Sequence, residues 1–243
     1  MPDLLPHTLT PAAFHSAVID LSPTIAVFDC DGTLWSGDAG SAFMHWTIET
    51  GLVSRSTAAW IDEKYRGYLR GDVSELDICG QMVQMYHGLR EAELRAAART
   101  FFAARIEKNI FPEMLKLVDA LRNRNVEIWA VSSTNDWVIE AGVERFGIPP
   151  SRVLAAKVHS DRTQDPSGII TDTLLDVPTD EGKADSLLRA GVPSPDAVFG
   201  NSIHDAAMLA MARRAFPVNP SPDLLEYSAH QGWPVFYPTS ITP

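Results

Sequence analysis

Two carboxylates stand two residues apart at the end of an apolar run. Asp29 and Asp31 lie in Phe28-Asp-Cys-Asp-Gly-Thr-Leu34, directly after the run 24–28. In an extended chain, side chains at positions i and i+2 point to the same side. Ligands of parallel sheets bind beyond the carboxyl ends of the strands. Gly32 lets the backbone turn close to a ligand, although an Asp-Gly pair is also an ordinary turn.

The chemistry that suits these two carboxylates is transfer of a phosphoryl group. Asp29 suits a nucleophile that attacks phosphorus and forms an acyl-phosphate, which divides one difficult displacement into two easier ones. Asp31 suits the general acid that protonates the leaving oxygen and then the base that activates water. Because a second carboxylate nearby penalises double ionisation, Asp31 can hold the proton that this role requires.

Two further polar residues follow later in the chain. Ser132 comes directly after the apolar run 126–131 and can donate a hydrogen bond to a phosphoryl oxygen. Lys183 supplies the fixed positive charge that an anionic phosphate needs beside several carboxylates. Taken singly, Ser132 could instead cap the following helix, and Lys183 could be a solvated residue at a helix start.

The elements that must position these residues alternate along the chain. Short apolar runs typical of buried parallel strands occupy 24–28, 126–131, 197–199 and 215–218. Helical patterns occupy 113–124, 137–146, 184–190 and 205–212. This order predicts an α/β fold, a Rossmann-like parallel sheet with helices between its strands.

One long stretch breaks this alternation. Residues 38–108 contain four helical segments, at 41–50, 57–70, 74–86 and 91–108, and no convincing strand. They predict an inserted all-helical cap domain, with 1–37 and 109–243 forming the α/β core. Within the core, 151–175 is expected to form a β-hairpin or flap, and 1–23 a short helix that covers the core.

In these motifs the chain resembles the haloacid dehalogenase superfamily of hydrolases, in particular its phosphoserine-phosphatase-like branch. The family signature is an Asp-x-Asp-Gly-Thr loop, a Ser or Thr after a second strand, a Lys, and a Gly-Asp-x-x-x-Asp loop. The counterparts here, in family order, are Asp29 and Asp31, Ser132, Lys183 and the segment 200–205. The resemblance covers nearly the whole chain after residue 24. It implies a phosphatase with a helical C1-type cap.

The resemblance also implies a Mg²⁺ cofactor. Its expected ligands are Asp29, Asp31 through the backbone carbonyl, Asn201 and Asp205. With water and a phosphate oxygen, these groups could complete the octahedron that Mg²⁺ prefers. The chain departs from the family at Asn201, where an Asp ligand is usual. An amide oxygen can still ligate but removes one negative charge, and Asp205 could coordinate through water or take over the direct role.

In capped members of the family the cap selects the leaving group, so the substrate preference is expected to lie in residues 38–108. Asp38 stands where phosphoserine phosphatases carry an acidic residue that meets the substrate amino group. Met82 takes the place of the Arg that meets the substrate carboxylate, and Glu75 takes the place of a Phe. The resemblance therefore implies a substrate with a cationic end and no carboxylate, such as a phosphocholine-like or amino-alcohol phosphate.

Aromatic side chains are frequent in or near the cap, at Trp35, Trp46, Trp60, Tyr65, Tyr68 and Tyr86. They could form a wall against a cation, or they could simply fill the core of the cap. Trp35 and Trp46 are the residues we expect to face the site. The predicted substrate contacts are Gly32, Ser133, Asp38, Trp35, Trp46 and Glu75.

Composition excludes several classes of protein. The 243 residues are 45% hydrophobic, enough for a buried core, and the net charge of −11 opposes binding to nucleic acid or to an anionic membrane. The chain has no membrane-length apolar run, and its first residues lack the basic start of a secretory signal. With only Cys30 and Cys79, no disulfide framework is expected. We predict a cytoplasmic protein whose partner is a small phosphorylated metabolite; the oligomeric state is left open.

Two other functions compete with the phosphatase interpretation. A dehalogenase, in which an Asp attacks carbon without a metal, is favoured by Asn201 but opposed by Asp31, which dehalogenases of this superfamily lack. A non-catalytic phosphate-binding protein is opposed by the presence of all four of the motif residues Asp29, Asp31, Ser132 and Lys183. His204 is expected to be a packing or hydrogen-bonding residue and Cys30 to point into the core.

Overall fold

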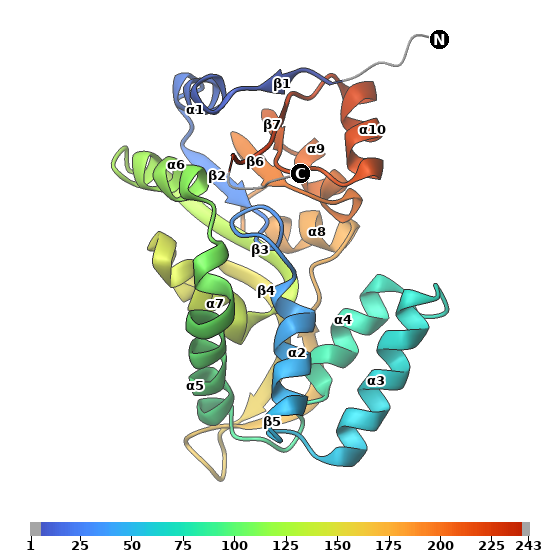
Figure 1. Cartoon of the computed structure of the whole chain (residues 1–243). Helices are drawn as coiled ribbons and strands as arrows, with labels where there is room; N and C mark the ends of the chain where they lie inside the picture. The colour runs from blue at the N-terminus through green and yellow to red at the C-terminus, as the bar shows by residue number, and fades with distance from the viewer. Residues whose placement is uncertain (1–5, 240–243) are drawn as a thin grey trace.

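A six-stranded sheet forms the centre of the protein. The computed structural model describes residues 6–239, and its sheet has the strand order β5-β4-β3-β2-β6-β7 (Figure 1). The strands are β2 (Ile25–Phe28), β3 (Glu127–Asn135), β4 (Val153–Asp161), β5 (Ile169–Asp176), β6 (Ala197–Gly200) and β7 (Arg214–Pro217). All neighbouring strands are parallel except β4 and β5, which form an antiparallel hairpin. The predicted α/β fold class is confirmed.

The register of the central strands brings their carboxyl ends together. Phe28, the last residue of β2, pairs with Ala130 in β3 and with Phe199 in β6. The residues that follow these positions therefore emerge at one edge of the sheet. This edge is where the chemistry-bearing side chains were expected to meet.

The sheet is buried on both faces, as its uninterrupted apolar strands require. Ala26 and Phe28 pack into one apolar cluster and Val27 into another. The first cluster includes residues of α1 (Pro11–Asp20), α6 (Pro112–Arg122) and α7 (Asp136–Val143); the second includes residues of α8 (Glu181–Arg189), α9 (Ala206–Ala210) and α10 (Pro222–Gln231). The short strands β1 (Thr8–Leu9) and β8 (Val235–Phe236) form a separate parallel pair.

Four helices form the inserted segment, close to the predicted ranges. They are α2 (Ala39–Glu49), α3 (Arg55–Leu69), α4 (Glu75–Gln84) and α5 (Glu91–Phe101). A π-helical turn (Phe102–Ile106) and a 3₁₀ turn (Glu107–Asn109) then return the chain to the core. We propose residues 38–108 as a cap domain and the remainder as the core; residues 1–5 and 240–243 of that core lie outside the described part of the chain.

The β4–β5 hairpin connects the cap to the sheet. The backbone N–H of Gly88 donates to the carbonyl of Ile170 (2.8 Å), and the N–H of Ile170 donates to the carbonyl of Leu89 (2.9 Å). Gln84 adds a side-chain hydrogen bond to the carbonyl of Asp172 (2.7 Å). In Figure 1 the hairpin extends beside the cap helices. Within residues 6–239, no helix combines the length and the apolar character that crossing a bilayer demands.

Candidate active site

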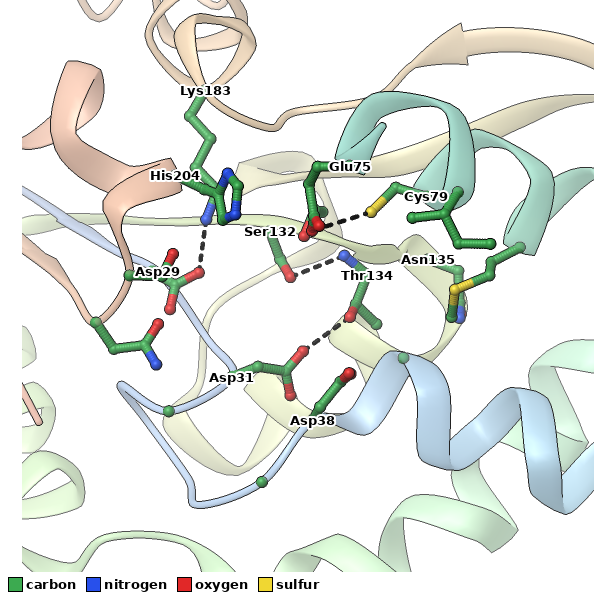
Figure 2. A pocket seen from close by; sticks show the side chains of 18 of the residues that line it. Asp29, Asp31, Asp38, Glu75, Cys79, Ser132, Thr134, Asn135, Lys183 and His204 are labelled. Atoms are coloured by element: carbon green, nitrogen blue, oxygen red, sulfur yellow. Dashed lines mark hydrogen bonds and ion pairs between the residues drawn. The ribbon is translucent and has the colours of Figure 1, made fainter. Parts of the chain in front are cut away.

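A cavity of about 480 Å³ lies where the sheet edge meets the cap. Its wall contains residues that the chain carries far apart, from the loop after β2, the end of β3, α8, the loop after β6, and cap helices α3 and α4. Figure 2 shows Asp29, Lys183 and Glu75 on this wall. Of the predicted site residues, those that line it are Asp29, Asp31, Gly32, Asp38, Glu75, Ser132, Ser133, Lys183 and Asn201. Trp35, Trp46 and Asp205 are not among its lining residues.

Asp29 shares a buried ion-pair cluster with Lys183. The Lys183 Nζ lies 2.7 Å from Asp29 Oδ1 and 2.5 Å from Asp205 Oδ1, and the Thr33 hydroxyl donates to Asp29 Oδ2 (2.8 Å). Burial and the Asp205 charge raise the pKa of Asp29, and Lys183 only partly offsets them. Burial lowers the pKa of Lys183, but the two carboxylates outweigh burial and raise it. Lys183 is therefore a permanent cation facing the candidate nucleophile.

Asp31 is held by three hydrogen-bond donors. The indole N–H of Trp35 (2.7 Å) and the backbone N–H of Ala39 (2.8 Å) donate to Oδ1, and the Thr134 hydroxyl donates to Oδ2 (2.8 Å). Burial raises the pKa of Asp31, and the nearby Asp38 carboxylate raises it further. These contacts fix the direction of the carboxyl group, and the raised pKa favours the protonated form that a general acid needs.

The prediction that Trp35 faces the substrate is wrong. Its side chain is fully buried, packs edge-on against Phe102 with ring centroids 5.1 Å apart, and donates to Asp31 from behind the cavity. Trp35 therefore acts as a positioning residue for Asp31. The spacing of the two residues is the signal that was missed. In a tight turn, a side chain four positions after Asp31 can fold back to hydrogen-bond to that carboxylate.

The prediction that Trp46 faces the substrate is also wrong. Trp46 is half-buried, packs against Phe43 and Phe101 with ring centroids 6.0 and 5.9 Å apart, and does not line the cavity. The aromatic residues that do line the cavity are Tyr65 and Tyr68, from α3. Their spacing of three residues places both on one face of a helix, but the pattern does not show which face meets the active site.

The end of β3 is irregular where it reaches the cavity. The register of β3 with β4 shifts between Ser132 and Asn135, as in a β-bulge, so the residues between leave the regular ladder. Ser132 is buried, and its hydroxyl accepts from the backbone N–H of Thr134 (3.1 Å). The irregularity turns Ser133 and Thr134 toward the cavity, and Thr134, not predicted as a site residue, supports Asp31.

Gly32 is required where the loop after β2 passes the loop after β6. Its φ of +76° is left-handed, and a Cβ there would lie 1.9 Å from Nδ2 of Asn201. A larger residue would therefore have to displace the Asn201 side chain and adopt a left-handed backbone conformation. The close approach places the Asn201 amide directly against the loop that carries the two aspartates.

Asp205 does not fit the direct metal-ligand role, one of the two roles that the sequence left open for it. It is fully buried; Oδ1 accepts from Lys183, and Oδ2 accepts from the backbone N–H groups of Asn201 (2.8 Å) and Ser202 (2.9 Å). Because Asp205 does not line the cavity and its oxygens are held by Lys183 and the loop, it positions these two groups.

A test of metal fit rests on the remaining donors. Across residues 6–239, no three His, Cys, Asp or Glu side chains are grouped to hold a metal ion. The hard oxygen donors at the cavity are the Asp29 carboxylate, the Asp31 carbonyl and the Asn201 amide. The buried carboxylates of Asp29 and Asp205 share the single ammonium of Lys183. The net negative charge of this cluster favours binding of a cation. Mg²⁺, which keeps several waters and needs few protein ligands, fits this set.

Other predicted features are placed by the same contacts. His204 lines the cavity, and its Nδ1 lies 2.6 Å from Asp180 Oδ1, a hydrogen-bonded role. Cys30 is fully buried in the core, as expected from strand alternation. Cys79 lines the cavity beside Glu75.

Comparison with known proteins places this geometry in a family. Residues 26–210 match the haloacid dehalogenase-like hydrolases. A histidinol-phosphatase of Neisseria meningitidis serogroup C is 25% identical over 221 residues, which are 87% of this chain and 97% of that protein.

Solved structures are similar in fold. A Bordetella pertussis Tohama I protein matches with a TM-score of 0.76 and 22% identity, over 87% of this chain and 97% of that one. A phosphoserine phosphohydrolase-like protein from Francisella tularensis matches with a TM-score of 0.56 and 15% identity, over 80% and 87% of the two chains.

Proposed function

The chain belongs to the haloacid dehalogenase-like hydrolases, and from this premise we propose that it hydrolyses a small phosphomonoester through an aspartyl-phosphate intermediate. The observation that carries the proposal is the pairing of Asp29 with Lys183 beside an Asp31 held by three donors. The Neisseria relative is a phosphatase by name, which supports phosphorus as the atom attacked.

In the first step an oxygen of Asp29 attacks phosphorus and forms a new P–O bond. The bond from phosphorus to the leaving oxygen breaks, and the Asp31 proton passes to that oxygen. Lys183 and the Ser132 hydroxyl stabilise the phosphoryl oxygens, whose charge is greatest in the transition state. In the second step Asp31 accepts a proton from water, the water oxygen attacks phosphorus, and Asp29 is released with inorganic phosphate.

We propose that Mg²⁺ assists this reaction, held by Asp29, the carbonyl of Asp31 and Asn201. When bound, the ion would neutralise phosphoryl charge that Lys183 alone cannot balance. Calorimetric titration of the resting protein with MgCl₂ tests the site without relying on turnover.

The proposed substrate has a cationic end and no carboxylate. Glu75 and Asp38 line the cap end of the cavity, and Met82 lies there in place of a basic residue. Among its described lining residues, the lone lysine is Lys183 and there is no arginine. Histidinol phosphate, an amine phosphate without a carboxylate, fits these features. A small phosphorylated metabolite as partner, and a cytoplasmic location, belong to the same proposal.

A phosphate-release screen with rapid acid quench tests the function. We expect release from p-nitrophenyl phosphate and from amine phosphates, and a phosphate adduct on the peptide that contains Asp29 by mass spectrometry. Absence of both release and adduct, with Mg²⁺ supplied, contradicts the proposal.

A second candidate is a metal-independent hydrolase such as a dehalogenase, which Asn201 favours. The three donors on Asp31 oppose it, because they hold a group that such a reaction does not need. Full phosphatase activity after chelation, or halide release from 2-haloacids, would favour this candidate; binding of phosphate without turnover would favour a non-catalytic protein.

A further inference from the structure

The two acidic residues at the cap end of the cavity differ in what they already bind. Asp38 is the N-cap of α2: its Oδ1 accepts from the Ser41 backbone N–H (3.0 Å) and its Oδ2 from the Ser41 hydroxyl (2.7 Å). It is also exposed to solvent, which screens its charge. Asp38 is therefore partly committed to starting a helix, and its remaining acceptor sites already face water.

Glu75, the first residue of α4, has a free acceptor. Its Oε1 accepts from the Cys79 thiol (3.5 Å), whereas its Oε2 is buried and receives no hydrogen bond from the described chain. A buried acceptor without a donor loses its hydration and gains nothing in return. A ligand N–H placed in the cavity would remove that penalty.

The neighbours of Glu75 supply no compensating positive charge. Burial raises the pKa values of Tyr68 and Cys79, and the Glu75 carboxylate raises both further, so these groups stay neutral. No lysine or arginine within residues 6–239 forms an ion pair with Glu75. Its place in the first turn of α4 stabilises the carboxylate through the helix dipole.

Two tyrosines complete this part of the wall. Tyr65 and Tyr68 both line the cavity, with ring centroids 6.1 Å apart and planes inclined by 40°. Aromatic rings attract cations of any kind, but only a cation with N–H groups also satisfies the free oxygen of Glu75. A quaternary ammonium carries no N–H and would leave that oxygen buried and unbonded.

We infer that Glu75, rather than Asp38, binds the cationic end of the substrate and selects a group that carries N–H donors over a quaternary ammonium. This inference rests on the proposed phosphatase function. It makes Glu75 a specificity-determining residue, supplied by a cap helix and separate from the residues that act on phosphorus.

Substrate ratios in isosteric variants test the inference. Phosphate release would be measured for L-histidinol phosphate and glycerol 1-phosphate in the wild type, Glu75→Gln, Asp38→Asn and the control Glu63→Gln. The control removes an acidic charge from an exposed position of α3 that does not line the cavity. We expect Glu75→Gln to lower the kcat/KM ratio of the two substrates by about 10- to 100-fold, mainly through KM. Asp38→Asn and the control should change it by less than about 3-fold.

A second substrate pair tests the selection of N–H donors. Phosphoethanolamine should be hydrolysed with a higher kcat/KM than phosphocholine by the wild type, and Glu75→Gln should remove most of that difference. Glu75→Lys should shift preference toward phosphoserine.

The outcomes separate the two proposals. The inference is overturned if Glu75→Gln releases phosphate from glycerol 1-phosphate but leaves the kcat/KM ratio of L-histidinol phosphate to glycerol 1-phosphate unchanged. It is also overturned if only Asp38→Asn lowers that ratio. Either result leaves the phosphatase function standing. Preference of the wild type for phosphocholine also overturns it. Failure to release phosphate from any substrate, including p-nitrophenyl phosphate, removes the phosphatase function itself.

Discussion

The two ends of the cavity are constructed differently. At the sheet edge, Asp29, Asp31 and Lys183 each make two or more charged or charge-assisted hydrogen bonds within the protein. At the cap end, Glu75 has one weak donor and a free oxygen. The side chains that act on phosphorus are thus oriented before the substrate binds. Glu75, which we propose selects the substrate, gains a hydrogen bond to its free oxygen only when a ligand is present. Substitutions should therefore affect rate at one end and preference at the other.

The largest effect should come from Asp29→Asn at the sheet edge. An amide is a poor nucleophile, so turnover should fall by at least about 10⁴-fold for every substrate, equally for cationic and neutral ones. Steady-state phosphate release measures the loss, and an unchanged thermal transition shows that the fold persists. Retention of more than a small fraction of activity would mean that another group attacks phosphorus.

Asp205→Asn should weaken the support of the sheet-edge cluster. It replaces the buried Asp205 carboxylate, which pairs with Lys183, by a neutral amide. We therefore expect the free energy of unfolding to fall by about 1–3 kcal/mol. Urea denaturation measures this, with the exposed Asp185→Asn on α8 as the control. An Asp205 that mattered only for catalysis would leave the urea midpoint in place.

Asn201→Asp should strengthen cation binding at the same end. The substitution restores a negative charge beside Asp29, so we expect Mg²⁺ affinity to rise by about 10-fold, measured by calorimetry in the absence of substrate. An equal or weaker affinity would exclude Asn201 from the metal site.

The smallest effect should come from Tyr65→Leu at the cap end. Loss of one ring facing a hydrated cation should lower kcat/KM for an amine phosphate by about 2- to 5-fold, with glycerol 1-phosphate affected less. Equal losses for both substrates would show that Tyr65 only shapes the cavity.

The sheet edge was also the more predictable of the two ends. Strand-end positions follow from hydrophobic runs, and the parallel register of β2 and β3 then brings Asp29 and Ser132 to one cavity, which Lys183 reaches from α8. The membership in the hydrolase family and the α/β fold are confirmed. The extension of β3 to Asn135 was missed because its last residues are polar and irregular.

The cap end was less predictable because helix periodicity gives two faces without identifying the one that meets the core. Trp35 and Trp46 were placed at the site for their chemistry, yet Trp35 is fully buried and the half-buried Trp46 packs against rings of the cap. A large indole gains more from such packing. The direct metal-ligand role considered for Asp205 does not fit for a related reason, since its hydrogen bonds to backbone N–H groups depend on a turn that spacing alone does not show.

The backbone bonds between the cap and the β4–β5 hairpin define the unit that protein engineering can exchange. Residues 38–108 transplanted alone from a relative would have to present their own backbone N–H and carbonyl to Ile170 in the geometry that Gly88 and Leu89 hold. A chimera should therefore carry the hairpin strand together with the four helices, two separate pieces of sequence that serve as one module.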